Sequence, residues 1–169
     1  MATSTYNLIA SQVVGSGGAA SVTFSSIPNT YTDLKVVAST QQTGAATTAS
    51  LNLTLNGSSS GFTYRALQGS GSGASSINGS TGYWGQGDAA SATANTFGNA
   101  EFYLPNYTSS NYKSISADTV DENNIAAAYA QFTALLWSNT AAITSVSLVS
   151  GNGNWAQYST FYLYGITNH

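Results

Sequence analysis

The sequence has no cysteine, and only 5% of its 169 residues are charged. Without cysteine the chain forms no disulfide, no thiolate nucleophile and no cysteine-ligated zinc site. Three Lys and Arg residues in total are too few for a basic surface that neutralises phosphates, which excludes nucleic acid as a partner. Neither a signal segment nor an apolar run of membrane-spanning length is present, so we expect no membrane partner.

Groups suited to catalysis are equally scarce. The single histidine, His169, is the last residue, and a catalytic base must be held rigidly by a neighbouring group. The run from Asp118 to Asn124 offers oxygen atoms to calcium but lacks the spacing of an EF-hand loop. We interpret this run as a solvated turn. The sequence therefore predicts a protein that is not an enzyme and has no metal or cofactor.

The residues that are present favour one folded domain over 1–169. Apolar residues make up 42% of the chain and aromatic residues 12%, which is sufficient for a core and excludes charge-driven disorder. Ser, Thr, Asn and Gly replace the missing charged residues. A surface of hydroxyls and amides is covered at little desolvation cost, which suits a component of an assembly and equally suits an extracellular β protein.

Apolar and polar residues alternate in many short segments, which is typical of half-buried β-strands. Turn sequences such as Asn56-Gly57 separate these segments. We predict an antiparallel β-sandwich, jelly-roll-like, with eight to eleven strands. The Ala-rich residues 125–130 are the one helix candidate, but the alternation that runs on through Trp137 favours a long strand. The same alternation assigns Phe132 to the core, together with Val22, Phe24, Leu51, Leu53, Leu55, Phe102, Leu104, Val146, Leu148, Phe161 and Leu163.

Residues 68–97 interrupt the pattern with a stretch rich in Gly, Ser and Ala. We interpret this stretch as a long interaction loop, with Tyr83 and Trp84 as the anchor that fills a partner's pocket. Trp155 lies in a second Gly/Asn-rich turn and is a further candidate for partner binding. The alternative is that these aromatic side chains only cover the ends of the sandwich.

Three blocks of sequence carry a family resemblance: VTFSSIPNTYTDL at 22–34, AEFYLPNY at 100–107 and STFYLYGI at 159–166. Together they resemble virion proteins of tailed bacteriophages, notably phages of cyanobacteria and marine bacteria. Members of that group are described as structural proteins, either capsid cement or decoration proteins or parts of tail fibres. The resemblance implies a jelly-roll-type sandwich, a homotrimer and no catalytic residues. Residues 68–97 lie outside the matching blocks.

The expected function is that of a capsid cement protein on the outer surface of the virion, bound to the major capsid protein and to copies of itself. Many copies would each connect neighbouring capsid subunits and strengthen the shell. The first alternative is a receptor-binding module of a tail fibre that recognises host polysaccharide. The second is a carbohydrate-binding domain of a secreted enzyme.

Overall fold

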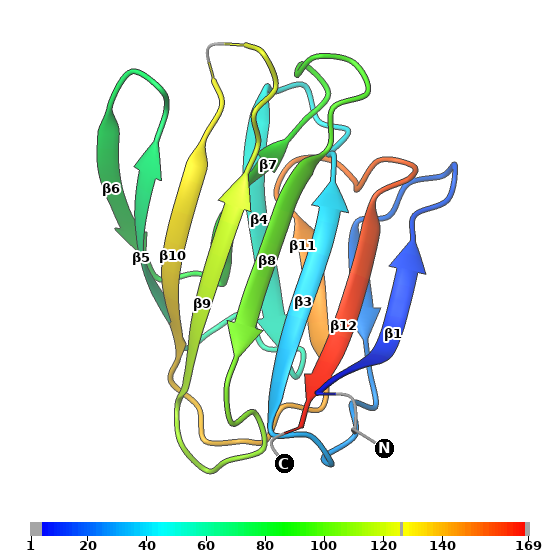
Figure 1. The fold of residues 1–169 in the computed structure, drawn as a ribbon, viewed down its shortest axis with the longest axis vertical. Coiled ribbons are helices and arrows are strands. Elements are labelled where there is room, and N and C mark those ends of the chain that lie inside the picture. Colours follow the sequence, from blue (N-terminus) through cyan, green and yellow to red (C-terminus); the bar gives the residue numbers. More distant parts are fainter. Residues whose placement is uncertain (1–4, 126, 168–169) are drawn as a thin grey trace.

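The computed structural model describes residues 5–125 and 127–167, and these residues form twelve strands and no helix (Figure 1). The alternating residues of the sequence become strands because one side of each can face the core while the other faces solvent. The strands are β1 (Tyr6–Val13), β2 (Ser21–Phe24), β3 (Asp33–Thr40), β4 (Thr48–Leu55), β5 (Phe62–Gly69), β6 (Ala74–Gly79), β7 (Tyr83–Asp88), β8 (Gly98–Leu104), β9 (Lys113–Val120), β10 (Ala130–Trp137), β11 (Val146–Ser150) and β12 (Thr160–Ile166).

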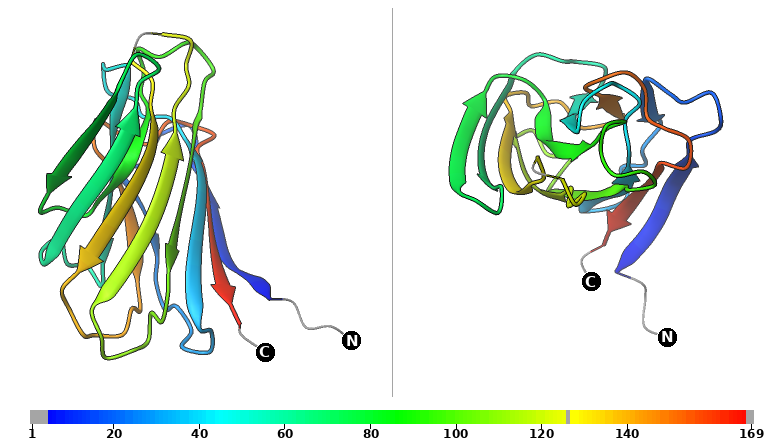
Figure 2. Two further views of the ribbon diagram at one scale, coloured as in Figure 1. Left: turned by 60° about the vertical axis from the view of Figure 1, so that its left-hand side comes forward. Right: turned by 90° about the horizontal axis from the view of Figure 1, so that it is seen from above.

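The strands form two antiparallel sheets. The larger sheet has the order β1-β12-β3-β8-β9-β10-β5-β6, and the smaller has the order β2-β11-β4-β7. Seen from above, the β10-β5-β6 end of the larger sheet curls around β7 of the smaller one (Figure 2). The prediction of an all-β, jelly-roll-like antiparallel sandwich is confirmed, with one strand more than the expected maximum.

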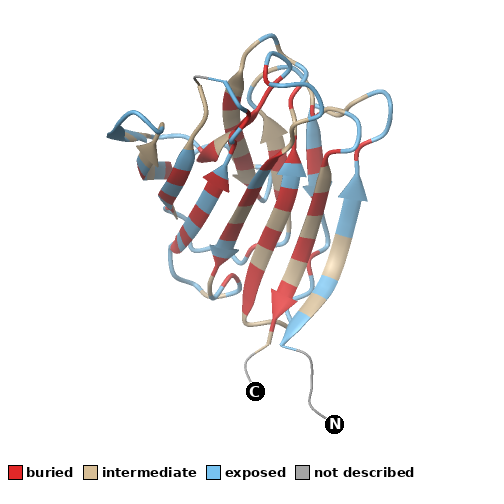
Figure 3. Ribbon diagram, turned by 45° about the horizontal axis from the view of Figure 1, so that its top comes forward, coloured by how far each residue is buried: buried red, intermediate tan, exposed pale blue. Residues whose placement is uncertain are grey.

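The core lies between the two sheets and follows the period-two pattern, visible as stripes of buried residues along the strands (Figure 3). In β4, Leu51, Leu53 and Leu55 are buried while the residues between them are half-exposed. Apart from Phe132, none of the side chains assigned to the core exposes more than 6% of its surface. The Asn56-Gly57 turn also forms as predicted, with positive φ angles of 51° and 73°.

Strand β10 is the exception, because its faces are reversed relative to the prediction. Phe132 is 57% exposed, whereas Gln131, Thr133 and Leu135 are buried. The strand starts only at Ala130, so the predicted strand does not extend over residues 125 and 127–129, and residue 126 lies outside the described residues. Trp137 settles the register, since its ring stacks on Phe62 in the core with centroids 6.1 Å apart. With Trp137 inward, the period of two directs Phe132 to the outside.

The prediction that residues 68–97 form an interaction loop is wrong, because this segment supplies two strands. β6 forms a hairpin with β5 at the edge of the larger sheet, and β7 pairs with β4 in the smaller sheet. Main-chain hydrogen bonds to β5 and β4 therefore order the Gly- and Ser-rich chain, and they offset the entropy lost on fixing it.

Candidate functional site

All three side chains predicted to bind a partner lie in the core. Trp84 and Trp155 are fully buried, and Tyr83 is 4% exposed. The Trp84 ring meets Phe102 edge-on at 5.3 Å, and the Trp155 ring meets Phe161 at 5.2 Å. The prediction that they are surface anchors is therefore wrong. Their surroundings match the alternative in which they pack inside the sandwich.

A β-bulge explains why two adjacent aromatic residues both point inward. Asn52 pairs with Tyr83 and the preceding Leu51 pairs with Gly85, so Trp84 is an extra residue in β7 without a partner in β4. An extra residue interrupts the strict alternation of side chains. The Tyr83 hydroxyl consequently reaches the interior and donates to Gln131 Oε1 at 2.8 Å. Burial raises the pKa of Tyr83 to about 12.

Large exposed apolar side chains gather instead on the outer side of the eight-stranded sheet. Leu67 on β5, Phe132 on β10 and Val120 on β9 are 61%, 57% and 47% exposed. Phe132 is directly opposite Leu67, and Val120 is opposite Ala130. We call this group of Leu67, Val120, Ala130 and Phe132 the apolar face. A shallow groove of about 450 Å³ runs along it.

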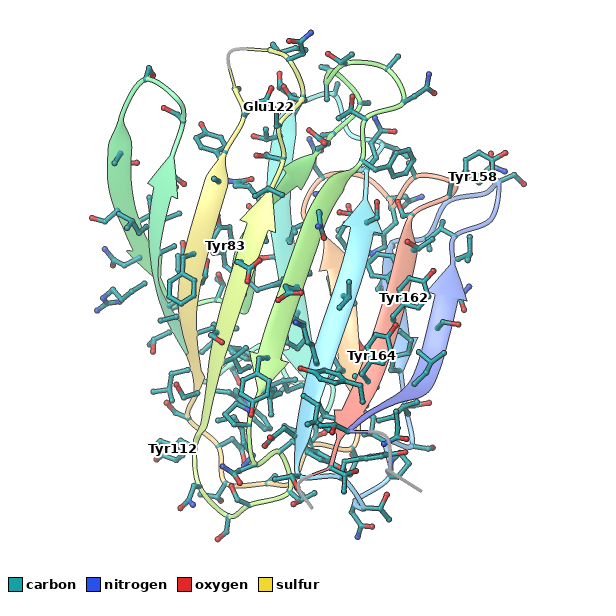
Figure 4. The ribbon with its side chains drawn as sticks, viewed as in Figure 1. Tyr83, Tyr112, Glu122, Tyr158, Tyr162 and Tyr164 are labelled. Atoms are coloured by element: carbon teal, nitrogen blue, oxygen red, sulfur yellow. The ribbon has the colours of Figure 1, made fainter. Side chains whose placement is uncertain are left out.

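Tyrosines gather at the other end of the same sheet surface. Tyr162 and Tyr164 project from β12 toward the viewer in Figure 4. Their rings are stacked with centroids 6.4 Å apart, and Tyr6 on β1 meets Tyr164 edge-on at the same distance. We call Tyr6, Tyr162 and Tyr164 the tyrosine row. Exposed aromatic rings flanked by hydroxyls can stack against flat apolar ligand surfaces and donate hydrogen bonds at the same time.

Few charged residues lie between the apolar face and the tyrosine row. Lys35 on β3 and Glu101 on β8 form an ion pair at 2.8 Å. Burial raises the pKa of the nearby Asp118, and the Glu101 carboxylate raises it further. Close by, the Tyr103 hydroxyl donates to Asp33 Oδ2 at 2.7 Å, which raises the pKa of Tyr103 to about 12. The tyrosine hydroxyl is therefore neutral at physiological pH.

The expectation of a solvated turn at 118–124 is wrong, because residues 118–120 belong to β9 and three side chains of the run, Thr119 among them, are buried. Asp121 is fully buried and Asn123 is 2% exposed, whereas Glu122 between them faces solvent. The Asp121 carboxylate accepts a hydrogen bond from the Tyr129 amide, and Asn123 Nδ2 donates to Asp88 Oδ1 at 2.9 Å. Burial, and then the charge of Asp88, raises the pKa of Asp121 to about 6.

Within residues 5–125 and 127–167, no three His, Cys, Asp or Glu side chains come together as a group able to hold a metal. His169 lies outside the described residues. In the same part of the chain, no helix is long and apolar enough to cross a membrane.

Sequence reasoning missed the apolar face because residues 132–137 are apolar on both sides of the strand. Phe132, Ala134 and Leu136 alternate with Thr133, Leu135 and Trp137, so hydrophobicity alone does not choose between the two faces. Trp137 was the available signal. Placing the largest side chain in the core would have assigned Phe132 to the surface.

Comparisons with known proteins show no family for this chain. No protein-family model and no curated protein matches the sequence. Among solved structures, a tetrameric galectin from the ball sponge Cinachyrella sp. is 10% identical, with a TM-score of 0.37, covering 86% of this chain and 99% of that one. Caenorhabditis elegans galectin LEC-6 is 12% identical, with a TM-score of 0.36, covering 94% and 96%.

Proposed function

We propose that the chain is a non-enzymatic structural protein of a tailed-phage virion, a capsid cement protein that binds the outer capsid surface through its apolar face. The observation that carries the proposal is the exposure of Leu67, Phe132 and Val120 on three neighbouring strands. Isolated exposed apolar side chains are ordinary on soluble proteins, but a contiguous group on one face of a sheet marks an interaction surface. The assignment to a virion rests on the resemblance of the three sequence blocks.

The charge distribution supports contact with another protein surface. Burying the apolar face strips water from apolar carbon, which is favourable. Asp118 is directly opposite Phe132 and lines the groove, and Arg65 lies one same-face pair beyond Leu67, so two charged groups in total lose hydration on contact. An interface of this kind is held by apolar contact and amide hydrogen bonds, and salt screens it little. A surface of the major capsid protein that accepts it would be largely apolar and would offer a hydrogen-bond donor to Asp118.

Self-association as a homotrimer is a second part of the proposal. It rests on the family resemblance, since the structure contains one chain. The mass of the purified protein in solution, measured by light scattering after gel filtration, tests it. A mass of three chains is the expected result, and a monomer at all concentrations would contradict it.

Copy number in purified virions tests the cement function. Quantitative mass spectrometry should find the chain in numbers comparable with those of the major capsid protein, and gold-labelled antibodies should decorate the whole capsid. A few copies per particle located at the tail would contradict the cement function. Absence of the chain from virions would contradict the virion assignment altogether.

The tyrosine row favours one alternative, recognition of host polysaccharide by a tail-fibre module. Tyr6 is exposed and Tyr162 and Tyr164 are half-buried, so this row beside the Lys35–Glu101 pair offers ring surface and polar groups to a sugar. Binding to purified host polysaccharide, lost in Tyr164→Ala and retained in Phe132→Ser, would establish this alternative. Equal binding by both variants would exclude the tyrosine row as the sugar site.

A further inference from the structure

The larger sheet is open at both ends of its strand order. β1 and β6 are its outermost strands, and each pairs with only one neighbour in the described part of the chain (Figure 1). An edge strand presents main-chain N–H and C=O groups with which a further strand can pair. The hydrogen bonds at the end of each ladder show which groups are free, since bonded and unbonded pairs alternate along antiparallel strands.

The turn of the β5–β6 hairpin identifies the free groups of β6. The Ser70 amide donates to the Gly73 carbonyl at 3.0 Å, so these two residues form a bonded pair. Every second pair along the hairpin is bonded in the same way, which uses the odd-numbered residues of β6. The main-chain groups of Ala74, Ser76 and Asn78 therefore point away from β5.

The other side of β5 agrees with this assignment. The Ser138 amide donates to the Gly61 carbonyl at 2.8 Å just before β5 begins. Counting in twos from Gly61 assigns the odd-numbered residues of β5 to bonds with β10 and the even-numbered ones to bonds with β6. The even-numbered residues of β5 are opposite the odd-numbered residues of β6, as the hairpin turn requires.

The free groups of β1 follow from the same alternation. The Val14 amide donates to the Ser159 carbonyl at 2.9 Å, so Val14 bonds toward β12. One residue back, Val13 points its main-chain groups away from β12, and so does Ser11. The register with β12 shifts before Ala10, so Ser11 and Val13 form the regular part of this edge.

Neither edge carries the usual protection against pairing. Soluble proteins protect edge strands with charged residues, proline or bulges. The sequences YNLIASQV of β1 and ASSING of β6 contain no charged residue and no proline, and the register of β6 with β5 is regular. Ser11, Val13, Ser76 and Asn78 are all exposed. Two such edges can approach each other without repulsion between like charges.

The two edges fit each other in strand direction. All seven neighbouring pairs of the larger sheet are antiparallel, so β1 and β6, the first and eighth strands, run in opposite directions. If two copies are related by a rotation about an axis along the strands, β6 of one copy is antiparallel to β1 of the next. The antiparallel pattern of the sheet would then continue from copy to copy.

The two edges also fit in the direction of their side chains. Residues directly opposite each other on neighbouring strands share one face of a sheet. Ser76 is opposite Leu67, on the outer surface that carries the apolar face. Ser11 is opposite Tyr162, on the same outer surface. Pairing the free residues of β6 with those of β1 therefore keeps the outer surfaces of both copies on the same side.

We propose that copies of this chain associate head to tail, with β6 of one copy paired to β1 of the next. The proposal deepens the homotrimer of the proposed function and rests on it. In the register that we propose, Ser76 is opposite Val13 of the next copy, and Asn78 is opposite Ser11. Each of these pairs exchanges two main-chain hydrogen bonds. Val13, which is 56% exposed, then lies in the same row as Leu67 with the small Ser76 between them.

A head-to-tail contact closes into a ring or continues as a filament, depending on the rotation between copies. The homotrimer corresponds to a closed ring of three. In such a ring β1 and β6 of every copy are paired, which removes the free edges of the larger sheet and the aggregation that they invite. The apolar face stays on the outer surface, where it remains available to a capsid.

A proline at position 76 tests the contact without disturbing the hairpin. Proline has no amide hydrogen, and it is tolerated on an edge strand where the amide faces solvent. Ser76→Pro therefore keeps the hydrogen bonds to β5 but removes a donor to the next copy. Ser76→Ala, which keeps the amide, is the matched control. Light scattering after gel filtration should give three chains for the wild type and Ser76→Ala, and one chain for a folded Ser76→Pro.

Cross-linking tests the register, and it also covers the case in which Ser76→Pro fails to fold. The chain has no cysteine, so two introduced thiols report a single contact. Directly opposite bonded residues have Cα atoms about 5.5 Å apart, which suits a disulfide. The variant Ser11→Cys/Asn78→Cys should form covalent oligomers on mild oxidation. Asn78→Cys with Asn99→Cys is the matched control, because Asn99 is exposed on β8 in the middle of the sheet, and it should stay uncross-linked.

The outcomes separate this contact from the proposed function. A three-chain mass retained by Ser76→Pro, or no cross-link in Ser11→Cys/Asn78→Cys, would overturn the β6–β1 contact and leave the homotrimer to another surface. Covalent dimers of Asn78→Cys alone would mean that β6 pairs with itself, which also contradicts the proposal. A wild type that is monomeric at all concentrations would overturn both the contact and the homotrimer, whereas its binding to capsids would still support the cement function.

Discussion

The interior of the sandwich and the outer surface of its larger sheet both carry large aromatic side chains, and their local sequences suggest the opposite of where they lie. Trp84 belongs to a Tyr-Trp pair that lies between two glycines, and it is fully buried. Phe132 sits in an apolar strand, and it is 57% exposed. Register and bulges, rather than neighbouring composition, decide which aromatic side chain enters the core.

The two regions should also differ in what each residue contributes. A side chain enclosed on all sides stabilises the fold, and its removal leaves a cavity. A side chain that remains more than half in water contributes little to folding and is available to a second molecule. The comparison would be contradicted if a buried side chain could be removed without loss of stability, or if removing an exposed one unfolded the protein.

The largest effect is expected from Trp84→Ala. The ring is fully buried against Phe102, so its removal should cost about 3–5 kcal/mol in the free energy of unfolding. Urea denaturation followed by circular dichroism measures this cost. A variant with wild-type stability that merely failed to assemble would restore Trp84 as a surface anchor and contradict the structure.

Asp121→Asn compares the apolar centre of the interior with the end of the sandwich where Asp121 is buried. The folded-state pKa of about 6 is above the roughly 3.9 of an unfolded aspartate. Between these values the folded state binds more protons, so in EDTA the stability of the wild type should fall as pH rises from about 4 to 6. The carboxyls of Asp88 and Glu122 and the Tyr83 hydroxyl are the titratable groups coupled to Asp121.

The Asn side chain does not ionise, so Asp121→Asn should be more stable than the wild type at pH 7.5 in EDTA. The gain is on the order of 2–3 kcal/mol, and it should vanish near pH 4. Urea denaturation at a series of pH values provides the measurement. A wild type whose stability rose between pH 4 and 6 while Asp121→Asn stayed flat would show that the buried carboxylate is already compensated within the chain.

Tyr83→Phe should have a smaller effect. It removes the hydroxyl that donates to Gln131 Oε1 but keeps the ring that packs on Tyr64 with centroids 4.6 Å apart. Leaving the buried amide oxygen unpaired costs about 1–3 kcal/mol. The midpoint of urea unfolding reports it. No change would mean that Gln131 finds another donor, and Gln131→Leu combined with Tyr83→Phe would then also be neutral.

Phe132→Ser should have the smallest effect on folding, within about 0.5 kcal/mol of the wild type, because the side chain lies mostly in solvent. Unfolding in urea would show it. A loss comparable with that of Trp84→Ala would mean that Phe132 is a core residue and that the register of β10 is wrong.

The sequence is sufficient to predict the fold where one side of a strand is apolar and the other polar. Leu51, Leu53 and Leu55 between Ser, Asn and Thr leave one choice of face. The two faces of β10 are similarly apolar, and the bulge at Trp84 depends on the partner strand β4. Only the size of Trp137 indicates which face of β10 is buried, and the apolar face depends on that choice. The bulge cannot be derived from local sequence.

The burial of Asp88 and Asp121 is harder still to predict from the sequence. Asp88 and Asp121 are 33 positions apart, and both lie beside Gly98 of β8 in the folded chain. In the sequence each acid is followed by residues typical of turns, which correctly predicts a strand end but not burial. Only the three-dimensional register shows that the acids face inward.

Association with capsids tests the central claim most directly, namely that the apolar face is the interaction surface. Capsids lacking the chain would be mixed with wild-type protein, with Leu67→Ser/Phe132→Ser, or with Tyr112→Ser, and then sedimented. Tyr112 is the matched control, since it is 59% exposed but lies in the loop between β8 and β9 (Figure 4). We expect the wild type and Tyr112→Ser to sediment with capsids at low and high salt alike, and the double variant to remain in solution while fully folded. Undiminished binding by the folded double variant would contradict the claim.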